Sequence, residues 1–447
     1  MINKLISVIA VFAFLFTASA QNARIDAMGG CDIIDDITGT IGNPADMNDY
    51  GDQLQGTADA TDFGAVLGIK GVGDMMNIGF MANQGAVLRG GFYSAAETIL
   101  EQSILDTNDL LPSSFPVYPH ILFGLDLDAV SLGLDMYYKA TRYKYSDEDG
   151  ADVVSREAKI SHFGFNVSAN LGVGDMAISP LFGIGFPKVK GLHEDKANDF
   201  EAEVTSLAGV RLQIGTELGY NPGKTDIIGG FFFTIESFQF DFDDNTTVTK
   251  MNENKDFFMD IYLGLMTKVL NGLFLVSQYN LTIGIDKEIQ VSNNDWEVKY
   301  NRFTHDFRLG LERPVSGVWI FDELIPRGGL TYQIYHGTYK SSNTDEDTLV
   351  TSNGANSTSQ FMVTTGIGLT KGIAAVDVAI SIGAWDGVLT GPSVIEGTLT
   401  LDFGKRSGAT SGSSYQTPPS PVTSEPASEP ATTGTTESSD SDIDFDF

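Results

Sequence analysis

Long stretches of strict apolar–polar alternation constrain this chain more than any other feature of its sequence. From Val130 to Tyr138 and from Phe257 to Leu265, every second residue is apolar. Most such stretches run for about the nine to eleven residues that a tilted strand needs to cross a bilayer. Strands of soluble proteins usually have about five or six residues. The length of the alternation therefore favours antiparallel strands that cross a membrane.

The connections between these stretches alternate between short and long. Short turns occur at Gly71, Gly172, Asn221, Asn271 and Lys371, and long polar stretches surround Ala86, Asp147, Lys196, Asp243, Asn294 and Thr348. Short periplasmic turns and longer outer loops are typical of bacterial outer-membrane barrels. A β-propeller or a jelly roll has no reason to alternate in this way. The sequence thus predicts an all-β fold, an antiparallel transmembrane β-barrel, and a secreted soluble β-rich protein is the alternative.

The number of strands follows less directly from the pattern. About fifteen candidate strands can be counted, and a barrel whose two ends both lie in the periplasm needs an even number. A weak strand near Gln53 to Ala60 would make sixteen. We expect about 14 strands, within a range of 14–16. The segment from Gln84 to His120 does not alternate, and its part from Ala95 to Leu105 is expected to be a short helix.

Both ends of the chain differ from the alternating region. Lys4 precedes the apolar run Leu5 to Phe16, and Ala18-Ser19-Ala20 follows, so residues 1–20 are expected to be a signal peptide cut before Gln21. Residues 405–447 are rich in Ser, Thr, Pro and acids, which predicts a disordered acidic tail on the periplasmic side. The tail ends in alternating aromatics at Phe445 and Phe447. The barrel-assembly machinery could recognise that end or the closing strand Gly397 to Phe403.

Composition excludes several classes of function. The net charge of −32 argues against nucleic acid as a partner, since phosphate binding needs clustered Lys and Arg. The single cysteine, Cys31, cannot form an intramolecular disulfide. The sequence has no catalytic constellation and no metal-ligand or cofactor motif in a suitable context. We therefore expect a protein that is not an enzyme and that uses no cofactor or metal.

Isolated charges lie on the polar face of the alternating stretches. Such charges on the inner face of a barrel could bind a solute or tune ion selectivity. Pairing with one another, or with a segment inside the barrel, is the more frequent role and the one that we favour. These candidate lumen charges are Arg211, Glu217, Asp260, Arg308, Glu312 and Asp377, with Asp126, Asp135, Glu236 and Asp286 beside them.

The stretch from Asn22 to Met47 carries a resemblance to a known family. Its matching positions are Ala23, Arg24, Ala27, Met28, Gly29, Gly30, Asn43, Pro44, Ala45 and Met47. The pattern A-R-x-x-A-M-G-G followed by N-P-A-x-M resembles the start of mature outer-membrane barrels of the long-chain fatty-acid transporter (FadL-like, OmpP1) group and of the related PorV-like proteins. This resemblance implies a hatch segment at residues 21–50, with a turn at Asn43-Pro44-Ala45, and a barrel over residues 51–404.

The same resemblance implies two functions. FadL-like proteins admit hydrophobic compounds and release them by movement of the hatch or through an opening in the wall. PorV-like proteins help to export or anchor secreted proteins. We therefore expect a protein of the bacterial outer membrane that passively transports hydrophobic or other small solutes, or else a structural or secretion-associated barrel. Its expected partners are outer-membrane lipid, the assembly machinery, a small hydrophobic solute and a protein partner of the acidic tail.

Overall fold

A computed structural model describes most of the region between residues 23 and 403. The described residues are 23–28, 30–31, 33, 40, 42–50, 52–58, 63–70, 75–82, 119–127, 130–149, 152–195, 200–244, 247–270, 272–290, 296–345, 348–385 and 388–403. The predicted signal peptide, the predicted helix at residues 95–105, Gly29 and the acidic tail lie outside the described residues.

Two short helices precede the strands, which then follow one another without further helices in the described part of the chain. The helices are α2 (Ala23–Ala27) and the 3-10 helix η2 (Pro44–Asn48). Neither is long and apolar enough to cross a membrane. The strands are β1 (Gln53–Ala58), β2 (Phe63–Lys70), β3 (Met76–Ala82), β4 (His120–Asp126), β5 (Val130–Asp149), β6 (Asp152–Val173), β7 (Met176–Asp195), β8 (Phe200–Tyr220), β9 (Thr225–Asp244), β10 (Thr247–Leu270), β11 (Leu273–Gln290), β12 (Trp296–Glu312), β13 (Val315–Ser316), β14 (Glu323–Asp345), β15 (Thr348–Lys371), β16 (Ala374–Trp385) and β17 (Val388–Asp402).

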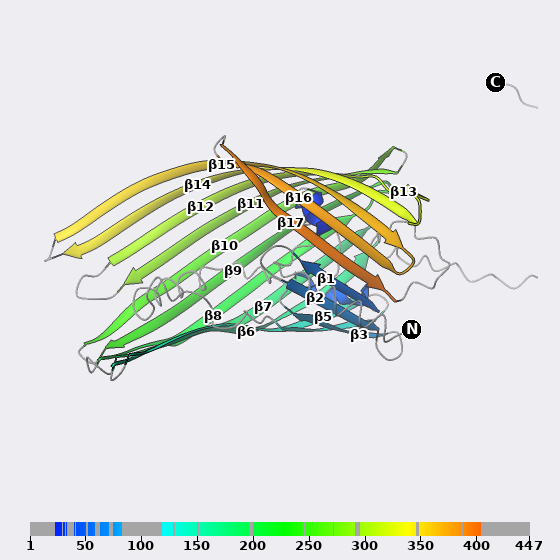
Figure 1. Cartoon of the computed structure of the whole chain (residues 1–447). Coiled ribbons are helices and arrows are strands. Elements are labelled where there is room, and N and C mark those ends of the chain that lie inside the picture. The colour runs from blue at the N-terminus through cyan, green and yellow to red at the C-terminus, as the bar shows by residue number, and fades with distance from the viewer. Residues whose placement is uncertain are drawn as a thin grey trace, which may run out of the picture.

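The strands form one closed antiparallel barrel (Figure 1). Each strand pairs with its sequence neighbours, except that β12 pairs with β14 past the short β13, and β1 closes the barrel against β17. The two-residue β13 pairs only with the first residues of β14, so sixteen strands make the wall. The expected count of about 14 is therefore wrong. Gln53 to Ala58 lacks a clear apolar face, and this strand forms because β17 and β2 flank it on both sides.

Most strands are much longer than the alternating stretches predict. β10 and β15 each have 24 residues, and β14 has 23. Most of the polar stretches interpreted as long loops are instead the ends of these strands, and β14 pairs with β15 as far as Asp345 and Thr348. Both faces of a hairpin that extends beyond a bilayer meet water, so apolar alternation ends there while backbone pairing continues. Alternation therefore marks the part of each strand whose outer face is apolar and not the end of the strand.

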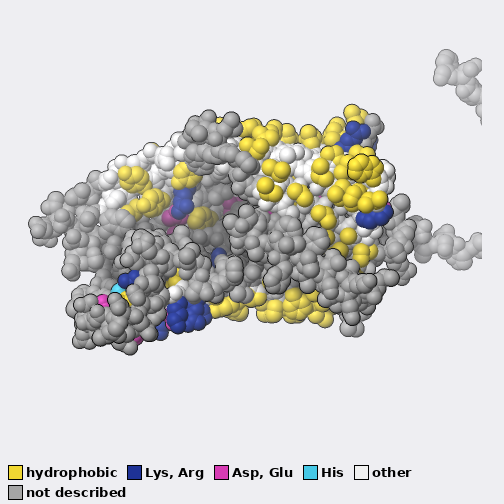
Figure 2. Space-filling model, viewed as in Figure 1, with side chains coloured by type: hydrophobic (Ala, Val, Ile, Leu, Met, Phe, Trp, Pro, Cys, Tyr) yellow, Lys and Arg dark blue, Asp and Glu magenta, His cyan; other side chains and the backbone are white. Residues whose placement is uncertain are grey.

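Charged side chains lie on the inside of the barrel and large apolar side chains lie on the outside, which is the reverse of the distribution in a soluble protein. Charged residues such as Asp135, Arg211 and Glu312 are buried on the inner face. Large apolar side chains point outward and are exposed, which is the distribution expected when the surrounding medium is lipid. We call this outward group the apolar belt; it includes Phe80, Leu132, Phe163, Phe182, Ile214, Phe231, Leu263, Phe307, Phe361, Val363 and Val378. On the face seen in Figure 2, yellow side chains gather over the half of the barrel that carries the short turns.

The described wall has unequal height around the barrel (Figure 1). β1 to β4 have only six to eight residues each, whereas their neighbour β5 has 20. The pairing of β17 with β1 runs from Asp402 only to Gly397, although β17 begins at Val388.

Candidate functional site

The candidate site is the contact between the N-terminal segment, defined here as the described residues from Ala23 to Tyr50, and the inner face of the wall. Its first part, α2, lies against β14 to β17. The Ala23 N–H donates to Thr398 Oγ1 at 3.0 Å, and Thr364 Oγ1 donates to the Ala27 carbonyl at 3.1 Å. Ala23 and Ala27 have no exposed surface. Their small side chains lie one helical turn apart, so this face of α2 approaches the wall closely.

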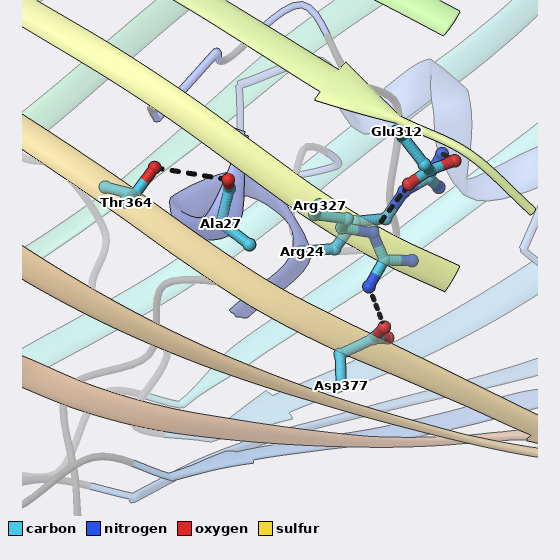
Figure 3. A network of polar contacts seen from close by, with 6 residues as sticks. All are labelled: Arg24, Ala27, Glu312, Arg327, Thr364 and Asp377. Atoms are coloured by element: carbon cyan, nitrogen blue, oxygen red, sulfur yellow. Dashed lines mark hydrogen bonds and ion pairs between the residues drawn. The ribbon is translucent and has the colours of Figure 1, made fainter. Parts of the chain in front are cut away.

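A chain of four charged side chains joins α2 to three wall strands (Figure 3). Arg24 donates to Glu312 through Nε at 3.1 Å and through Nη2 at 3.3 Å. Arg327 Nε donates to the same carboxylate at 2.6 Å, and Arg327 Nη1 donates to Asp377. The side chains of Glu312 and Arg327 are only 1% and 3% exposed. Paired opposite charges satisfy groups that would be costly to bury alone.

The part of the segment that follows α2 rests on an apolar cluster. Met28, Cys31 and Ile33 pack with Met266 and Val276 of the wall. Two inward-facing glycines make room for them. A Cβ on Gly310 would lie 2.9 Å from the Cβ of Met28, and one on Gly264 would meet the Ile33 side chain. Arg308 donates to the carbonyl of Gly30, so a wall charge also holds the backbone here.

The Asn43-Pro44-Ala45 sequence forms the start of η2, which packs against β5 and β6. Pro44 occupies the first turn of the helix, where its missing N–H removes no helical hydrogen bond. The Ala45 N–H donates to Ser168 Oγ at 2.8 Å. A Cβ on Gly133 would overlap the backbone of Pro44 and Ala45. A glycine at this wall position thus allows the segment to touch the strand backbone.

Polar and apolar contacts hold the rest of η2. Asn43 Nδ2 donates to Asn170 Oδ1 at 2.8 Å, and Asn170 Nδ2 donates to Asp46 Oδ1 at 2.7 Å. Met47 is fully buried against an apolar cluster made by β2, β3 and β4, namely Val66, Met81 and Leu122. Gly68, Gly79 and Gly124 stand beside it and leave space for Tyr50, Met47 and Asn48, respectively.

The predicted lumen charges lie on the inner face, and several have partners. Thr282 Oγ1 donates to Asp260 at 2.6 Å, Tyr262 donates to Glu217, and Arg308 contacts Asp306 at 2.6 Å. Glu312 and Asp377 belong to the chain of charges described above. The remaining inner charges lie close to other polar groups: His120 Nδ1 contacts Asp135 at 2.9 Å, Arg302 contacts Asp286, and Arg211 and Glu236 are buried.

Sequence reasoning did not single out Arg327, which links two of the predicted charges. Its position could have been found from register, since Arg327 shares the polar face with the inward residues of β14. The described residues contain no group of three or more His, Cys, Asp or Glu side chains that could hold a metal ion.

The comparisons with known proteins do not assign this chain to a family. No family model matches the chain, and no curated protein matches it. Solved structures with similarity include a mutant of the monoaromatic hydrocarbon channel TodX, at 10% identity over 87% of this chain and 100% of that chain with a TM-score of 0.43. The toluene transporter TbuX of Ralstonia pickettii has 12% identity over 87% and 98%, with a TM-score of 0.39. The β domain of the Bordetella autotransporter Brka has 10% identity over 60% and 98%, with a TM-score of 0.31. Identities and TM-scores this low assign the chain to none of these groups.

Proposed function

We propose that this protein is a barrel of the bacterial outer membrane that lets hydrophobic or other small solutes pass through its interior. The observation that carries the proposal is the combination of an apolar outer surface with a polar inner face in a closed barrel. In water the exposed apolar belt would be costly, whereas in a bilayer it is the favourable arrangement. The short-turn end then faces the periplasm and the long hairpins face outward.

In this proposal the N-terminal segment acts as the hatch. It contacts the inner face at two separated places, α2 against β14 to β17 and η2 against β3 to β6. Between them, Met28, Cys31 and Ile33 pack against the wall. The contacts of the described residues are a few hydrogen bonds, one chain of charges and three small apolar clusters. Such a set can separate without unfolding the wall, because the wall strands keep their own backbone pairing.

The apolar cluster of Met47, Val66, Met81 and Leu122 supports apolar solutes in particular. It joins η2 to the inner face of β2, β3 and β4. When η2 moves away, these apolar side chains become accessible to a solute in the interior.

The alternative, a structural or secretion-associated barrel, is favoured by one observation. The hairpins β5–β6, β9–β10 and β14–β15 continue well beyond the apolar belt, and such polar hairpins could present a surface to other proteins. A barrel of this second kind would insert into membranes and would show no flux of small solutes.

A reversible cross-link tests the transport proposal. The variant combines Met28→Cys and Gly310→Cys in a Cys31→Ser background. The two Cβ atoms would lie 2.9 Å apart. A disulfide needs a Cβ–Cβ distance of roughly 3.5–4.5 Å, so a shift of about 1 Å is required. The variant is reconstituted in liposomes, and uptake of a fluorescent fatty acid and of a labelled alkane is measured before and after reduction. The Met28→Cys single variant is the control.

The outcomes separate the alternatives. Uptake that is low after oxidation and is restored by a reducing agent supports both the transport function and the hatch. Uptake that is equal in both redox states contradicts the hatch. An inserted barrel with heat-modifiable gel mobility and no uptake of either probe, in the oxidised, reduced or parent form, contradicts transport and favours the secretion-associated alternative.

A further inference from the structure

Two histidines on the outer face of the wall lie beside each other on neighbouring strands. His305 of β12 is opposite Ile334 of β14. His336 of β14 is opposite Phe303 of β12, so the two histidines are diagonal neighbours. Their ring centroids are 6.2 Å apart, with an angle of 76° between the ring planes. The whole chain has five histidines, so two of them in direct contact on the surface are an unusual concentration of imidazole.

Both rings face outward where the apolar belt gives way to polar residues. Phe303 and Phe307, two positions before and after His305 on β12, are exposed on the outer face, and His305 shares that face because side chains alternate along a strand. His305 is half-buried and His336 is exposed. The next outward residue on β14, toward the long hairpins, is the polar and exposed Thr338. Ions in the surrounding water can therefore reach the pair.

Hydroxyl groups on the two flanking strands hold the rings by their Nδ1 atoms. Tyr279 Oη of β11 lies 2.9 Å from His305 Nδ1, and Ser357 Oγ of β15 lies 2.9 Å from His336 Nδ1. Because the strands follow the order β11, β12, β14 and β15, these hydroxyl groups lie on opposite sides of the pair (Figure 1). The two nitrogens of an imidazole point in nearly opposite directions. Each Nε2 is therefore turned toward the other ring.

This arrangement has the features of a metal site with two imidazole ligands. A histidine that binds a metal through Nε2 donates its Nδ1–H to an oxygen, which fixes both the tautomer and the orientation of the ring. Tyr279 Oη and Ser357 Oγ are in place as the acceptors. Within the described part of the chain, neither Nε2 has a hydrogen-bond partner. Both metal-binding nitrogens are thus available.

The spacing of the two rings fits one ion between them. A metal–nitrogen bond of about 2.1 Å places the ion about 3.2 Å from each ring centroid, so two bound rings are at most about 6.4 Å apart. The observed separation of 6.2 Å lies within this limit. A tetrahedral angle at the ion requires about 5.2 Å, and hence an approach of about 1 Å. The exposed His336 is the ring that can move.

The electrostatic surroundings are compatible with a cation. The chain has a net charge of −32, which raises the local concentration of cations. Lys340 lies on the same outward line of β14, four residues beyond His336. That distance is about 13 Å along the strand and exceeds the screening length of about 8 Å at physiological salt. No third His, Cys, Asp or Glu joins the pair in the described residues, so water completes the coordination.

We propose that His305 and His336 together bind one divalent transition-metal ion of the zinc or copper type through their Nε2 atoms. Imidazole is a preferred ligand of these ions, whereas Ca²⁺ and Mg²⁺ prefer oxygen ligands. The bound ion joins β12 to β14 on the outer face of the wall. The site is separate from the N-terminal segment, which lies on the inner face, and it does not depend on the passage of a solute.

The test measures metal binding by the full chain in dodecylmaltoside micelles, without a histidine tag. Isothermal titration calorimetry with Zn²⁺ gives the stoichiometry and the affinity. Electron paramagnetic resonance of bound Cu²⁺ gives the number of nitrogen ligands. The ligand variants are H305Q and H336Q, and the variants Y279F and S357A remove the hydroxyl groups but keep both ligands. H193Q is the matched control, because His193 lies on β7 and contacts Arg156.

We expect one Zn²⁺ per chain and two nitrogen ligands on Cu²⁺, with no competition from an excess of Ca²⁺. Y279F and S357A should each weaken binding about tenfold, the usual effect of losing a group that orients a ligand. H305Q and H336Q should weaken it further, and H193Q should bind as the parent protein does.

Three results would overturn the proposal: no binding by the parent, a single nitrogen ligand on Cu²⁺, or equal affinity of the parent and both ligand variants. Heat-modifiable gel mobility shows that each variant is folded. The first two results come from the parent protein alone, so they decide the question even where a variant fails to fold.

Discussion

Arg24 and Glu312 lie 288 positions apart in the sequence, and two hydrogen bonds of 3.1 and 3.3 Å join their side chains. The same carboxylate accepts a hydrogen bond from Arg327 of the wall. Glu312 therefore has one partner that can leave with the N-terminal segment and one that cannot. When α2 moves away, the carboxylate remains paired, which lowers the cost of opening compared with leaving a buried charge alone.

The first prediction uses Cys31 as a reporter of that movement. Cys31 is the only cysteine and has no exposed surface, so a maleimide reagent should label it slowly in the folded barrel. Arg24→Ala removes charge-assisted hydrogen bonds worth about 2 kcal/mol and should speed labelling about tenfold to thirtyfold. The measurement is the labelling rate followed by mass spectrometry. Arg142→Ala is the control, because its exposed pair with Glu157 is on the outer surface; an equal acceleration there would contradict the prediction.

The second prediction concerns the glycine beneath η2. Gly133→Ala adds a Cβ that overlaps the backbone of Pro44 and Ala45, and overpacking of this kind typically costs about 1–3 kcal/mol. We expect faster cleavage within residues 23–50 by a protease and faster labelling of Cys31. Gly172→Ala is the matched control, since nothing lies within 4 Å of its Cβ. Unchanged cleavage in both variants would show that η2 does not depend on this contact.

The third prediction tests the medium around the apolar belt. Leu263 is 55% exposed on the outer face. Leu263→Arg should lower the free energy of unfolding in lipid vesicles by about 2–4 kcal/mol if this position lies near the bilayer centre. Ala355→Arg places the same side chain on β15 in register with Thr338, above the belt, and should change stability by less than about 0.5 kcal/mol. Urea unfolding in vesicles gives both values, and equal effects would argue against a bilayer around the belt.

The fourth prediction concerns pH at a short turn outside the spanning part of the strands. Asp322 accepts a hydrogen bond from the Gly372 N–H at 2.7 Å and one from Lys371 Nζ at 3.1 Å. The backbone hydrogen bond first, and Lys371 second, hold the pKa of Asp322 below its usual value of 3.8. This contribution to stability is complete above pH 3.8 and is lost as the pH falls through the lower folded value.

Carbon NMR of the labelled Asp322 carboxyl group should therefore give a titration midpoint below 3.8. Lys371→Met should raise that midpoint only part of the way, because the hydrogen bond from Gly372 remains. A midpoint at or above the usual value in the parent protein would contradict the prediction. Asp322→Asn should lower stability at neutral pH, where the parent carboxylate is ionised, and the difference should shrink as the pH falls through the lower folded pKa of Asp322.

The barrel could be predicted well from the sequence, because the surroundings of each strand determine which of its residues are apolar and which are polar. Phe257 to Leu265 alternates since one face meets an apolar medium and the other a polar interior. The weak strand near Gln53 to Ala60, which would make sixteen, is present as β1. The expected count of about 14 did not include it, because β1 has no clear apolar face and exists through pairing with β17 and β2. The polar ends of the hairpins were interpreted as loops for a related reason. With water on both sides, Lys340 to Asp345 pairs with β15 without any apolar alternation.

Some residues of the candidate site could be predicted from the sequence, but the contacts between them could not. Gly30 and Asn43-Pro44-Ala45 stood out through backbone chemistry and resemblance, and Glu312 and Asp377 stood out as charges on a polar face. Their connection through Arg327 depends on which strands are neighbours across the barrel, and no local pattern encodes that. The roles of Gly133 and Gly310 could not be predicted either, because the role of a glycine in a strand depends on which segment packs against it.

The contacts of α2 have a consequence for the order in which this molecule can assemble. Ala23 is bound to Thr398, 375 positions later, and further partners of α2 belong to β12, β14, β15 and β16. A contact of such high sequence separation cannot form while the chain is still incomplete, and its loop-closure entropy must be met before it contributes anything. One of the earliest described elements of the chain is therefore among the last to reach its final place, and its docking marks the moment at which the wall is complete.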